Sequence, residues 1–324
     1  MISVIVATRD RASLLESTLD ALCRQTSPGC PVEIVIVDNG SVDRTSEVVH
    51  AAARQAPIPV SYLTEAKSGK SHALNTAVAH ARGDLLAFTD DDVLPVPGWL
   101  AAYARAFAET GADYAAGRIL PLWEATPPRW LTPAQHGVLA VRDGGTQRLT
   151  LAGVHDQVMP IGANMAVRRH VLDRVGGWNP DLGKLKDTVR TGEDHEFALK
   201  LAAAGFAGVY EPEACALHRV PGDRLRLEYF FRWCYSNGRI EAGLEQKFPS
   251  TTNYLLRVPR YLWRRLASDL ISTVTGIVTA DARPAASGAM RMAWFGGYLA
   301  GRWKPSPARR ATMPGPVIER GWRC

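Results

Sequence analysis

The stretch Leu85-Leu86-Ala87-Phe88-Thr89-Asp90-Asp91-Asp92 joins a predicted buried strand to three consecutive carboxylates. The strand therefore places a cluster of negative charge at one end of a sheet. Neighbouring carboxylates repel one another, and a divalent cation relieves that repulsion while leaving coordination positions for phosphate oxygens. The alternative is a solvated acidic turn that precedes the helix after Pro97.

Strands and helices alternate on either side of this stretch. Apolar runs at residues 2–7, 32–37 and 60–63 each lead into a polar turn and then a helical pattern. This order predicts βαβ units and a parallel sheet. Because each polar cluster follows a strand, we expect a ligand site at the carboxyl edge of the sheet.

The regular pattern continues less evenly toward residue 221. We expect a helix at 99–110, strands at 114–120 and 161–167, and a helix at 168–175. Prolines and glycines interrupt the pattern between residues 121 and 160, as is typical of a lid or acceptor loop. Two short strands are predicted near 209–210 and at 215–218.

A second acidic cluster, Thr191-Gly192-Glu193-Asp194-His195-Glu196, begins a predicted helix. Acidic residues in a first turn complement the helix dipole, which gives Glu193 and Glu196 a structural explanation. Asp194 becomes a candidate base because a metal-binding acidic motif precedes it. His218 ends the last predicted strand, where a histidine is usually structural. If that strand lies beside the one before Asp92, its imidazole is a candidate metal ligand.

The segment Lys67-Ser68-Gly69-Lys70-Ser71 resembles part of a phosphate loop. The full GxxxxGK[ST] spacing is absent because residue 64 is threonine, which excludes a Walker-type triphosphatase. A helix that begins near Lys70 offers its dipole and an ammonium group to a diphosphate. A solvated surface lysine is the alternative.

Length and charge suggest two parts. With 324 residues, 46% hydrophobic and 22% charged, the chain suits one large α/β unit with an appendage. Residues 1–223 carry 21 basic and 26 acidic side chains, a net charge of −5, whereas residues 224–324 carry 17 and 6, a net charge of +11. We therefore expect the basic part and the acidic part to contact different partners.

The basic part is predicted to form amphipathic helices, such as 224–242 and 253–277. Aromatic residues interleave with its arginines, which favours a membrane surface over nucleic acid. The apolar run at 266–280 spans 15 residues and contains Asp269, so it is too short to cross a bilayer, which takes about 20 apolar residues. Docking on the inner membrane face and forming a homodimer interface are the two alternatives.

The beginning of the chain and its five cysteines predict a cytosolic location. A strand begins at Ile2 with no basic leader before it, so no signal peptide is expected. The odd number of cysteines includes no CxxC pair, which favours reduced thiols over disulfides or a zinc site.

Taken together, the chain resembles the family 2 glycosyltransferases over residues 2–221. The matching motifs, in order, are Ile5-Val6-Ala7-Thr8-Arg9; Val35-Ile36-Val37-Asp38-Asn39-Gly40-Ser41; Gly69 with Ala73 and Asn75 before Ala81-Arg82-Gly83-Asp84; Phe88-Thr89-Asp90-Asp91-Asp92; Gly162-Ala163-Asn164-Met165; and Gly192-Glu193-Asp194-His195-Glu196. The resemblance implies a GT-A fold, a Rossmann-like mixed α/β sheet flanked by helices, as a catalytic domain at 1–222. The basic helical region follows at 223–324.

The resemblance also implies roles for individual residues. Thr8, Arg9 and Asp38 would hold the base and ribose of a nucleotide, and Asp38 would meet a uracil-like edge. Asp90 would contact the ribose, and Asp92 would bind Mg²⁺ or Mn²⁺. The remaining implied roles are Asp194 as general base, His218 as a further metal or diphosphate ligand, Gly69, Lys70 and Asp91 as donor contacts, and Asn164, Glu193, Trp178 and Arg232 as acceptor or diphosphate contacts.

The implied activity is an inverting, metal-dependent sugar transfer. The donor would be a nucleoside-diphosphate sugar, with UDP favoured by family habit, and the acceptor a hydroxyl of a glycan or lipid-linked precursor of the cell surface. Processive members of the family carry a QxxRW element and transmembrane helices. Here Tyr229 stands at the glutamine position before Arg232-Trp233, which predicts one sugar added per encounter at the cytoplasmic membrane face.

Two other functions compete with this one. A nucleotidyltransferase also sets acidic residues against nucleotide phosphates, but it normally needs a glycine-rich amino-terminal loop, and residues 7–10 contain no glycine. A non-catalytic sugar-nucleotide-binding or membrane scaffold protein would need neither the Asp90–Asp92 cluster nor Asp194.

Overall fold

The computed structural model describes residues 1–151, 158–183, 192–249 and 253–303. Thr191 of the second acidic cluster, residues 152–157 of the interrupted segment, and residues 304–324, with Cys324, lie outside the described residues. Within them, unit 1 consists of Met1–Leu122, Ala140–Thr188 and Glu193–Arg219, and unit 2 mainly of Trp123–Leu139 and Val220–Cys324. The sequence-based division fell after residue 222 and kept 123–139 with the first part.

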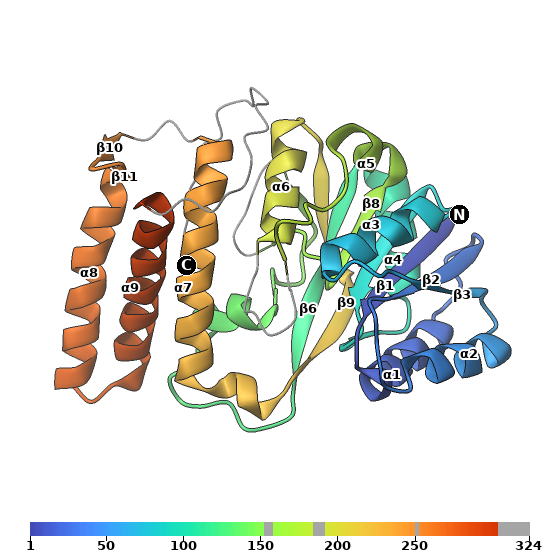
Figure 1. The fold of residues 1–324 in the computed structure, drawn as a ribbon, viewed down its shortest axis with the longest axis horizontal. Helices are drawn as coiled ribbons and strands as arrows, with labels where there is room; N and C mark the ends of the chain where they lie inside the picture. The colour runs from blue at the N-terminus through green and yellow to red at the C-terminus, as the bar shows by residue number, and fades with distance from the viewer. Residues whose placement is uncertain (152–157, 184–191, 250–252, 304–324) are drawn as a thin grey trace. The chain divides into compact units, whose positions relative to one another are not determined.

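Unit 1 contains a mixed sheet in the order β3-β2-β1-β4-β8-β6-β9-β5, with β7 (Leu149–Leu151) paired to β9 (Figure 1). The first four strands in this order, β3 (Val60–Thr64), β2 (Val32–Asp38), β1 (Ile2–Thr8) and β4 (Leu85–Asp90), are parallel to their neighbours. β8 (Asn164–Arg168) runs antiparallel to both β4 and β6 (Tyr114–Trp123). The predicted mixed α/β sheet is confirmed.

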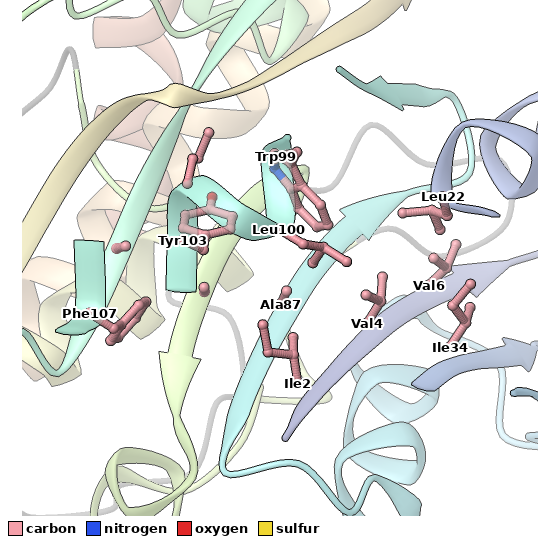
Figure 2. Close-up of a cluster of buried hydrophobic side chains, with 14 of the residues drawn as sticks. Ile2, Val4, Val6, Leu22, Ile34, Ala87, Trp99, Leu100, Tyr103 and Phe107 are labelled. Carbon is pink, nitrogen blue, oxygen red and sulfur yellow. The ribbon is translucent and has the colours of Figure 1, made fainter. Parts of the chain in front are cut away.

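Helices cover both faces of the sheet. α1 (Ala12–Cys23), α2 (Thr45–Gln55) and α4 (Trp99–Thr110) cover one face, and α3 (Lys70–His80), α5 (Arg169–Val175) and α6 (Glu193–Ala203) cover the other. Successive strand residues point to opposite faces. Val4 and Val6 therefore meet Leu22 and Trp99 in one cluster (Figure 2), while Ile5 packs in the other. Because both faces are covered, the central strands β1, β2 and β4 are mostly apolar rather than alternating.

The prediction of two short strands, near residue 209 and at 215–218, was wrong: they are a single strand, β9 (Gly208–Val220). The residues between the two predicted strands, Glu211-Pro212-Glu213-Ala214, belong to β9 as well, although a buried carboxylate such as that of Glu211 is costly without a partner. Glu211 is 2% exposed, but Arg148 lies within 2.6 Å of it and neutralises its charge. β9 pairs antiparallel with β5 (Val93–Pro95), so a histidine near its end lies beside the acidic stretch.

Asn164 connects the sheet to α4. Its Oδ1 accepts hydrogen bonds from Trp99 Nε1 at 2.7 Å and from the Tyr103 hydroxyl at 2.6 Å. Its Nδ2 donates to the carbonyl oxygens of Arg118 at 2.9 Å and Ala214 at 2.8 Å. The side chain is only 1% exposed, so its polar atoms are satisfied inside the protein. These hydrogen bonds give Asn164 a structural role, and its expected ligand contact stays a prediction.

Replacing this residue tests its structural role. Asn164→Ala leaves the Trp99 and Tyr103 donors buried without their acceptor, so we expect the free energy of unfolding to fall by about 3–5 kcal/mol in chemical denaturation. The exposed control Gln55→Ala should change it by less than about 0.5 kcal/mol. A loss below about 1 kcal/mol for Asn164→Ala would contradict the assignment.

Unit 2 is largely helical. It contains η1 (Pro133–Leu139), η2 (Gly222–Leu225), α7 (Leu227–Lys247), the hairpin of β10 (Tyr254–Leu255) and β11 (Val258–Pro259), α8 (Arg260–Val278) and α9 (Ala282–Trp303). α9 packs against α7 and α8 (Figure 1). A Cβ on Gly238 would lie 2.0 Å from the Trp294 carbonyl oxygen, so glycine lets the α7 and α9 backbones meet. The described helices are all too short or too polar to span a bilayer.

The predicted helices of the basic region begin too early. The segment 224–242 corresponds to η2 followed by α7, and 253–277 corresponds to the hairpin followed by α8. The start of the second segment is a hairpin because Leu256 and Arg257 both adopt positive φ, at 51° and 62°. Such a pair is characteristic of the tight turn that joins antiparallel strands.

Candidate functional site

The predicted donor-binding residues meet at the carboxyl edge of the sheet. The register of the parallel strands places Thr8 opposite Asp38 and Ala7 opposite Asp90. α3 begins at Lys70, after a loop that follows β3 at the same edge. The structure thus brings together side chains that are far apart in sequence.

Asp38 is held firmly at this edge. Its Oδ1 accepts a hydrogen bond from the Ser41 backbone N–H at 2.8 Å, and its Oδ2 accepts one from the Tyr62 hydroxyl at 2.6 Å. The residue is only 4% exposed. Because both oxygens already have a protein donor, the orientation of the carboxylate is fixed before any ligand arrives.

Asn39, which the sequence reasoning did not assign to the site, shapes the loop before α3. Its Nδ2 donates to the carbonyl oxygens of Glu65 and Lys67, and its Oδ1 accepts from the Gly69 N–H at 2.7 Å. Gly69 has φ +135°, a backbone conformation that residues with a Cβ rarely adopt. The same loop receives Arg9, whose Nη1 donates to Ser68 Oγ at 2.9 Å. The signal for Asn39 was its place in the polar turn after β2.

Lys70 joins the two acidic clusters. Its Nζ lies 2.5 Å from Asp90 Oδ1. A Cβ placed on Gly162 would lie 3.2 Å from Asp194 Oδ1 and 3.5 Å from Lys70 Nζ, so both side chains border this glycine. Burial alone would lower the pKa of Lys70, but the carboxylates of Asp90, Asp194 and Glu193 raise it above its ordinary value. The ammonium therefore stays charged between acids from β4 and α6.

The α6 acids are protonated more readily than exposed carboxylates. Burial raises the pKa of Asp194, and Lys70 opposes that rise. Burial, and then the charge of Asp194, raises the pKa of Glu193 to about 7. Asp194 Oδ1 and Trp178 Nε1 are both buried with no hydrogen-bond partner in the described part of the chain, although the indole is close enough to lower the pKa of Asp194. Asp194 thus has an acceptor atom available to a hydroxyl.

Asp92, the last residue of the acidic stretch, lies beside His218 of β9. His218 Nε2 is 3.4 Å from Asp92 Oδ1, because β5 pairs with β9 and places Val93 opposite His218. Both side chains are buried. Among the described residues, no three or more His, Cys, Asp or Glu side chains form a metal-binding group. This oxygen and nitrogen pair suits an Mg²⁺ or Mn²⁺ ion that takes its other ligands from water and phosphate.

Asp91 points into the protein instead. Its Oδ2 accepts a hydrogen bond from Thr8 Oγ1 at 2.8 Å, and Arg11 Nη1 lies 2.9 Å from its Oδ1. Arg11 also lies 2.8 Å from Asp92 Oδ2. Burial raises the pKa of Asp91 to about 6, and Arg11 opposes that rise. Arg11, which the sequence reasoning did not single out, lies in the charged turn just after Thr8.

The two remaining candidates, Trp178 and Arg232, differ in their burial. Trp178 is 2% exposed, stacks on Phe197 with ring centroids 4.8 Å apart, and tilts against Phe88. Arg232 is exposed on α7 and belongs to unit 2. Its predicted contact with a diphosphate stays a prediction.

The sequence matches the family model "Glycosyl transferase family 2" over residues 3–176. The chain belongs to this family. The resemblance drawn from the ordered motifs is therefore confirmed, and the protein is a glycosyltransferase.

Curated relatives agree with this assignment. Glycosyltransferase AglE of Haloferax volcanii is 24% identical over 230 residues, which cover 70% of this chain and 70% of the relative. Probable glycosyltransferase YdaM of Bacillus subtilis is 23% identical, over 68% of this chain and 51% of the relative. The pre-mycofactocin glycosyltransferase of Mycobacterium tuberculosis is 29% identical, over 67% of this chain and 42% of the relative. The chain thus spans about half the length, or less, of the last two.

Solved structures confirm the GT-A fold. The mannosyltransferase PcManGT of Pyrobaculum calidifontis, in complex with GDP-Man and Mn²⁺, has a TM-score of 0.65 and 21% identity over 94% of this chain and 88% of that chain. TarS 1–349 of S. aureus, in complex with UDP-GlcNAc, has a TM-score of 0.52 and 17% identity over 89% of this chain and 90% of that chain.

The raised pKa of Glu193 predicts a pH-dependent stability. An ordinary glutamate has a pKa of about 4.5, whereas the folded-state value here is about 7. The folded state holds this proton more tightly, so its contribution is present at low pH and is lost as pH rises from about 4.5 to about 7. Glu193→Gln should therefore gain roughly 1–3 kcal/mol of stability at pH 7.5 relative to wild type, and little at pH 4.

Thermal unfolding across this pH range measures the effect. The matched control Glu16→Gln, which changes an exposed carboxyl on α1, should leave the pH dependence of the wild type intact. Parallel curves for Glu193→Gln and wild type would show that Glu193 does not titrate in the folded state as expected.

Proposed function

We propose that this glycosyltransferase moves one sugar per encounter from a nucleoside-diphosphate sugar, UDP-linked by preference, to a hydroxyl of a glycan or lipid-linked acceptor, with inversion and with Mn²⁺ or Mg²⁺. The observation that carries the proposal is the meeting of Asp90, Lys70 and Asp194 at one point of the sheet edge. The proposal places the reaction at the cytoplasmic face of the membrane, in the assembly of cell-envelope polysaccharide or glycolipid.

The nucleoside would bind along the ends of β1, β2 and β4. Asp38, already fixed by Ser41 and Tyr62, would accept a hydrogen bond from the base. Asp90 would accept one from the ribose. Thr8 and Arg9 border the same edge, and PcManGT with GDP-Man and TarS with UDP-GlcNAc support a nucleotide sugar as the ligand.

The diphosphate would lie between two sources of positive charge. Asp92 and His218 would hold the metal ion, which when bound supplies charge to the departing diphosphate. The amino terminus of α3 provides backbone N–H groups, and Lys70 provides its ammonium. Arg11 keeps the Asp92 carboxylate in place through its Oδ2, which leaves Oδ1 facing His218.

Asp194 would act as the general base. Its buried Oδ1, without a partner in the part of the chain described, would accept the proton of the acceptor hydroxyl. The acceptor oxygen forms a bond to the anomeric carbon as the bond from that carbon to the diphosphate breaks, and a single displacement of this kind inverts the anomeric centre. Burial raises the pKa of Asp194, which makes it a stronger base than an exposed aspartate while Lys70 keeps it ionised.

A donor screen tests the assignment. UDP-, GDP- and dTDP-sugars would be tested for binding and hydrolysis, with and without Mn²⁺, on wild type, Asp92→Ala and Asp194→Asn. We expect one donor to bind with metal, Asp92→Ala to lose that binding, and Asp194→Asn to bind but to turn over roughly 10²–10⁴ times more slowly.

The exposed control Asp173→Asn on α5 should behave as wild type. Absence of sugar-nucleotide binding under all conditions would favour a scaffold protein, and release of pyrophosphate from a nucleoside triphosphate would favour a nucleotidyltransferase. A product that retains the donor's anomeric configuration, seen by NMR, would contradict single displacement.

Lys70→Met tests whether Lys70 lowers the pKa of Asp194 or only binds the donor. The positive charge of Lys70 opposes the rise in the pKa of Asp194, so its removal should raise that pKa further. The acidic limb of the kcat/KM profile should move to higher pH, and Lys70→Arg should largely restore it. An unchanged acidic limb with a raised KM would mean that Lys70 serves the donor alone.

A further inference from the structure

The outward face of α8 exposes five aliphatic side chains. The exposed fractions are 54% for Leu270, 67% for Ile271, 50% for Val274, 68% for Ile277 and 79% for Val278. Their spacing of one, three and four residues places them on one side of the helix. Near the start of the helix, Leu262 is buried in the core that also holds Phe295 of α9. In the carboxyl-terminal half, the side that meets α9 instead carries Asp269, Thr273 and Gly276, so the apolar side chains there lie on the outward face.

Positive charge continues the same face toward the start of the helix. Arg260 and Arg264 are exposed, and helical spacing places them in line with Ile271 and Val278. The single acidic residue of α8, Asp269, is 5% exposed and lies 2.5 Å from Arg291 Nε of α9. The outward face of α8 consequently offers cations and aliphatic groups without an exposed carboxylate of its own.

The neighbouring hairpin extends this combination. Leu256, at its turn, is 68% exposed, and the adjacent Arg257 is exposed as well. Tyr254 and Leu255 expose 40% and 48% of their surface. Apolar and basic side chains thus alternate from the turn of the hairpin into the first turn of α8.

We infer that this surface, formed by the hairpin turn and the outward face of α8, docks on an anionic lipid membrane. Aliphatic side chains gain by leaving water for the acyl boundary, and arginines gain by meeting anionic headgroups. A second copy of the chain fits the surface less well. A self-complementary interface would set Arg260 and Arg264 against the same cationic and aliphatic face, with no exposed acid on α8 to pair with them.

This docking surface rests on the membrane location proposed above. Vesicle binding can be measured without the sugar-transfer reaction, so the two proposals can fail separately. Full-length protein would be floated with vesicles of phosphatidylcholine containing 30% phosphatidylglycerol, and with vesicles of phosphatidylcholine alone, at low and high salt. Wild type should float with the anionic vesicles, and high salt should weaken that binding because charge contributes to it.

Two double variants separate the apolar and electrostatic contributions. Ile271→Ser with Val278→Ser should reduce the vesicle partition coefficient at least about tenfold, because each change removes methyl groups that would leave water on docking. Arg260→Glu with Arg264→Glu should reduce it at least about twentyfold, from about 1 kcal/mol, or fivefold, for each arginine removed near an anionic surface. These positions are exposed and unused by the proposed site, so donor hydrolysis should remain at the wild-type level.

Matched control variants in unit 1 are Val42→Ser, at a 93% exposed apolar residue, and Arg54→Glu, at an exposed residue of α2. Both should float as wild type does. Wild type that fails to float with anionic vesicles, or α8 variants that float normally, would overturn the inference. So would a dimer, seen by analytical ultracentrifugation, that dissociates in the Ile271→Ser, Val278→Ser variant while vesicles bind no protein.

Discussion

The ion pair between Lys70 and Asp90 is the interaction on which the site depends. Asp90 ends β4, whereas Asp194 begins α6, and both carboxylates are placed near the same ammonium. Buried carboxylates this close would otherwise repel one another and take up protons. The ammonium permits a donor-side acid and a candidate base to remain charged together. Its position follows from the loop before α3, which Asn39 holds through three hydrogen bonds.

The three consecutive aspartates have different partners because the strand ends among them: Asp90 is the last residue of β4, and Asp91 and Asp92 form the turn that leads into β5. Asp90 reaches Lys70, Asp91 turns inward to Thr8 and Arg11, and Asp92 lies beside His218. One segment thereby supplies a candidate donor contact, a structural anchor and a candidate metal ligand. In the fold, separate cations and hydrogen-bond donors compensate the three negative charges whose mutual repulsion marked this stretch in the sequence.

Sequence reasoning located the strands that carry the site because their apolar runs and polar ends are local patterns. It could not find what depends on distant partners. β9 continues through the buried Glu211, whose charge is neutralised by Arg148, a residue 63 positions away in the sequence. Asn164 matched a family motif and was expected near a ligand, yet its hydrogen bonds to Trp99 and Tyr103 bury it. The sequence reasoning did not name α9, whose Gly288 and Gly297 allow close packing: a Cβ on Gly297 would lie 2.0 Å from the Tyr235 carbonyl oxygen of α7.

The two parts of the chain carry net charges of opposite sign, so an anionic surface acts on them in opposite ways. Residues 1–223 carry a net charge of −5 and residues 224–324 a net charge of +11. An anionic membrane attracts the basic part and repels the acidic part, and both effects act within about a Debye length, roughly 8–10 Å. On the membrane that we propose, this difference would favour contact through the basic part. The aliphatic side chains of α8 would add short-range binding that salt does not screen, so charge and apolar burial would contribute separately to docking.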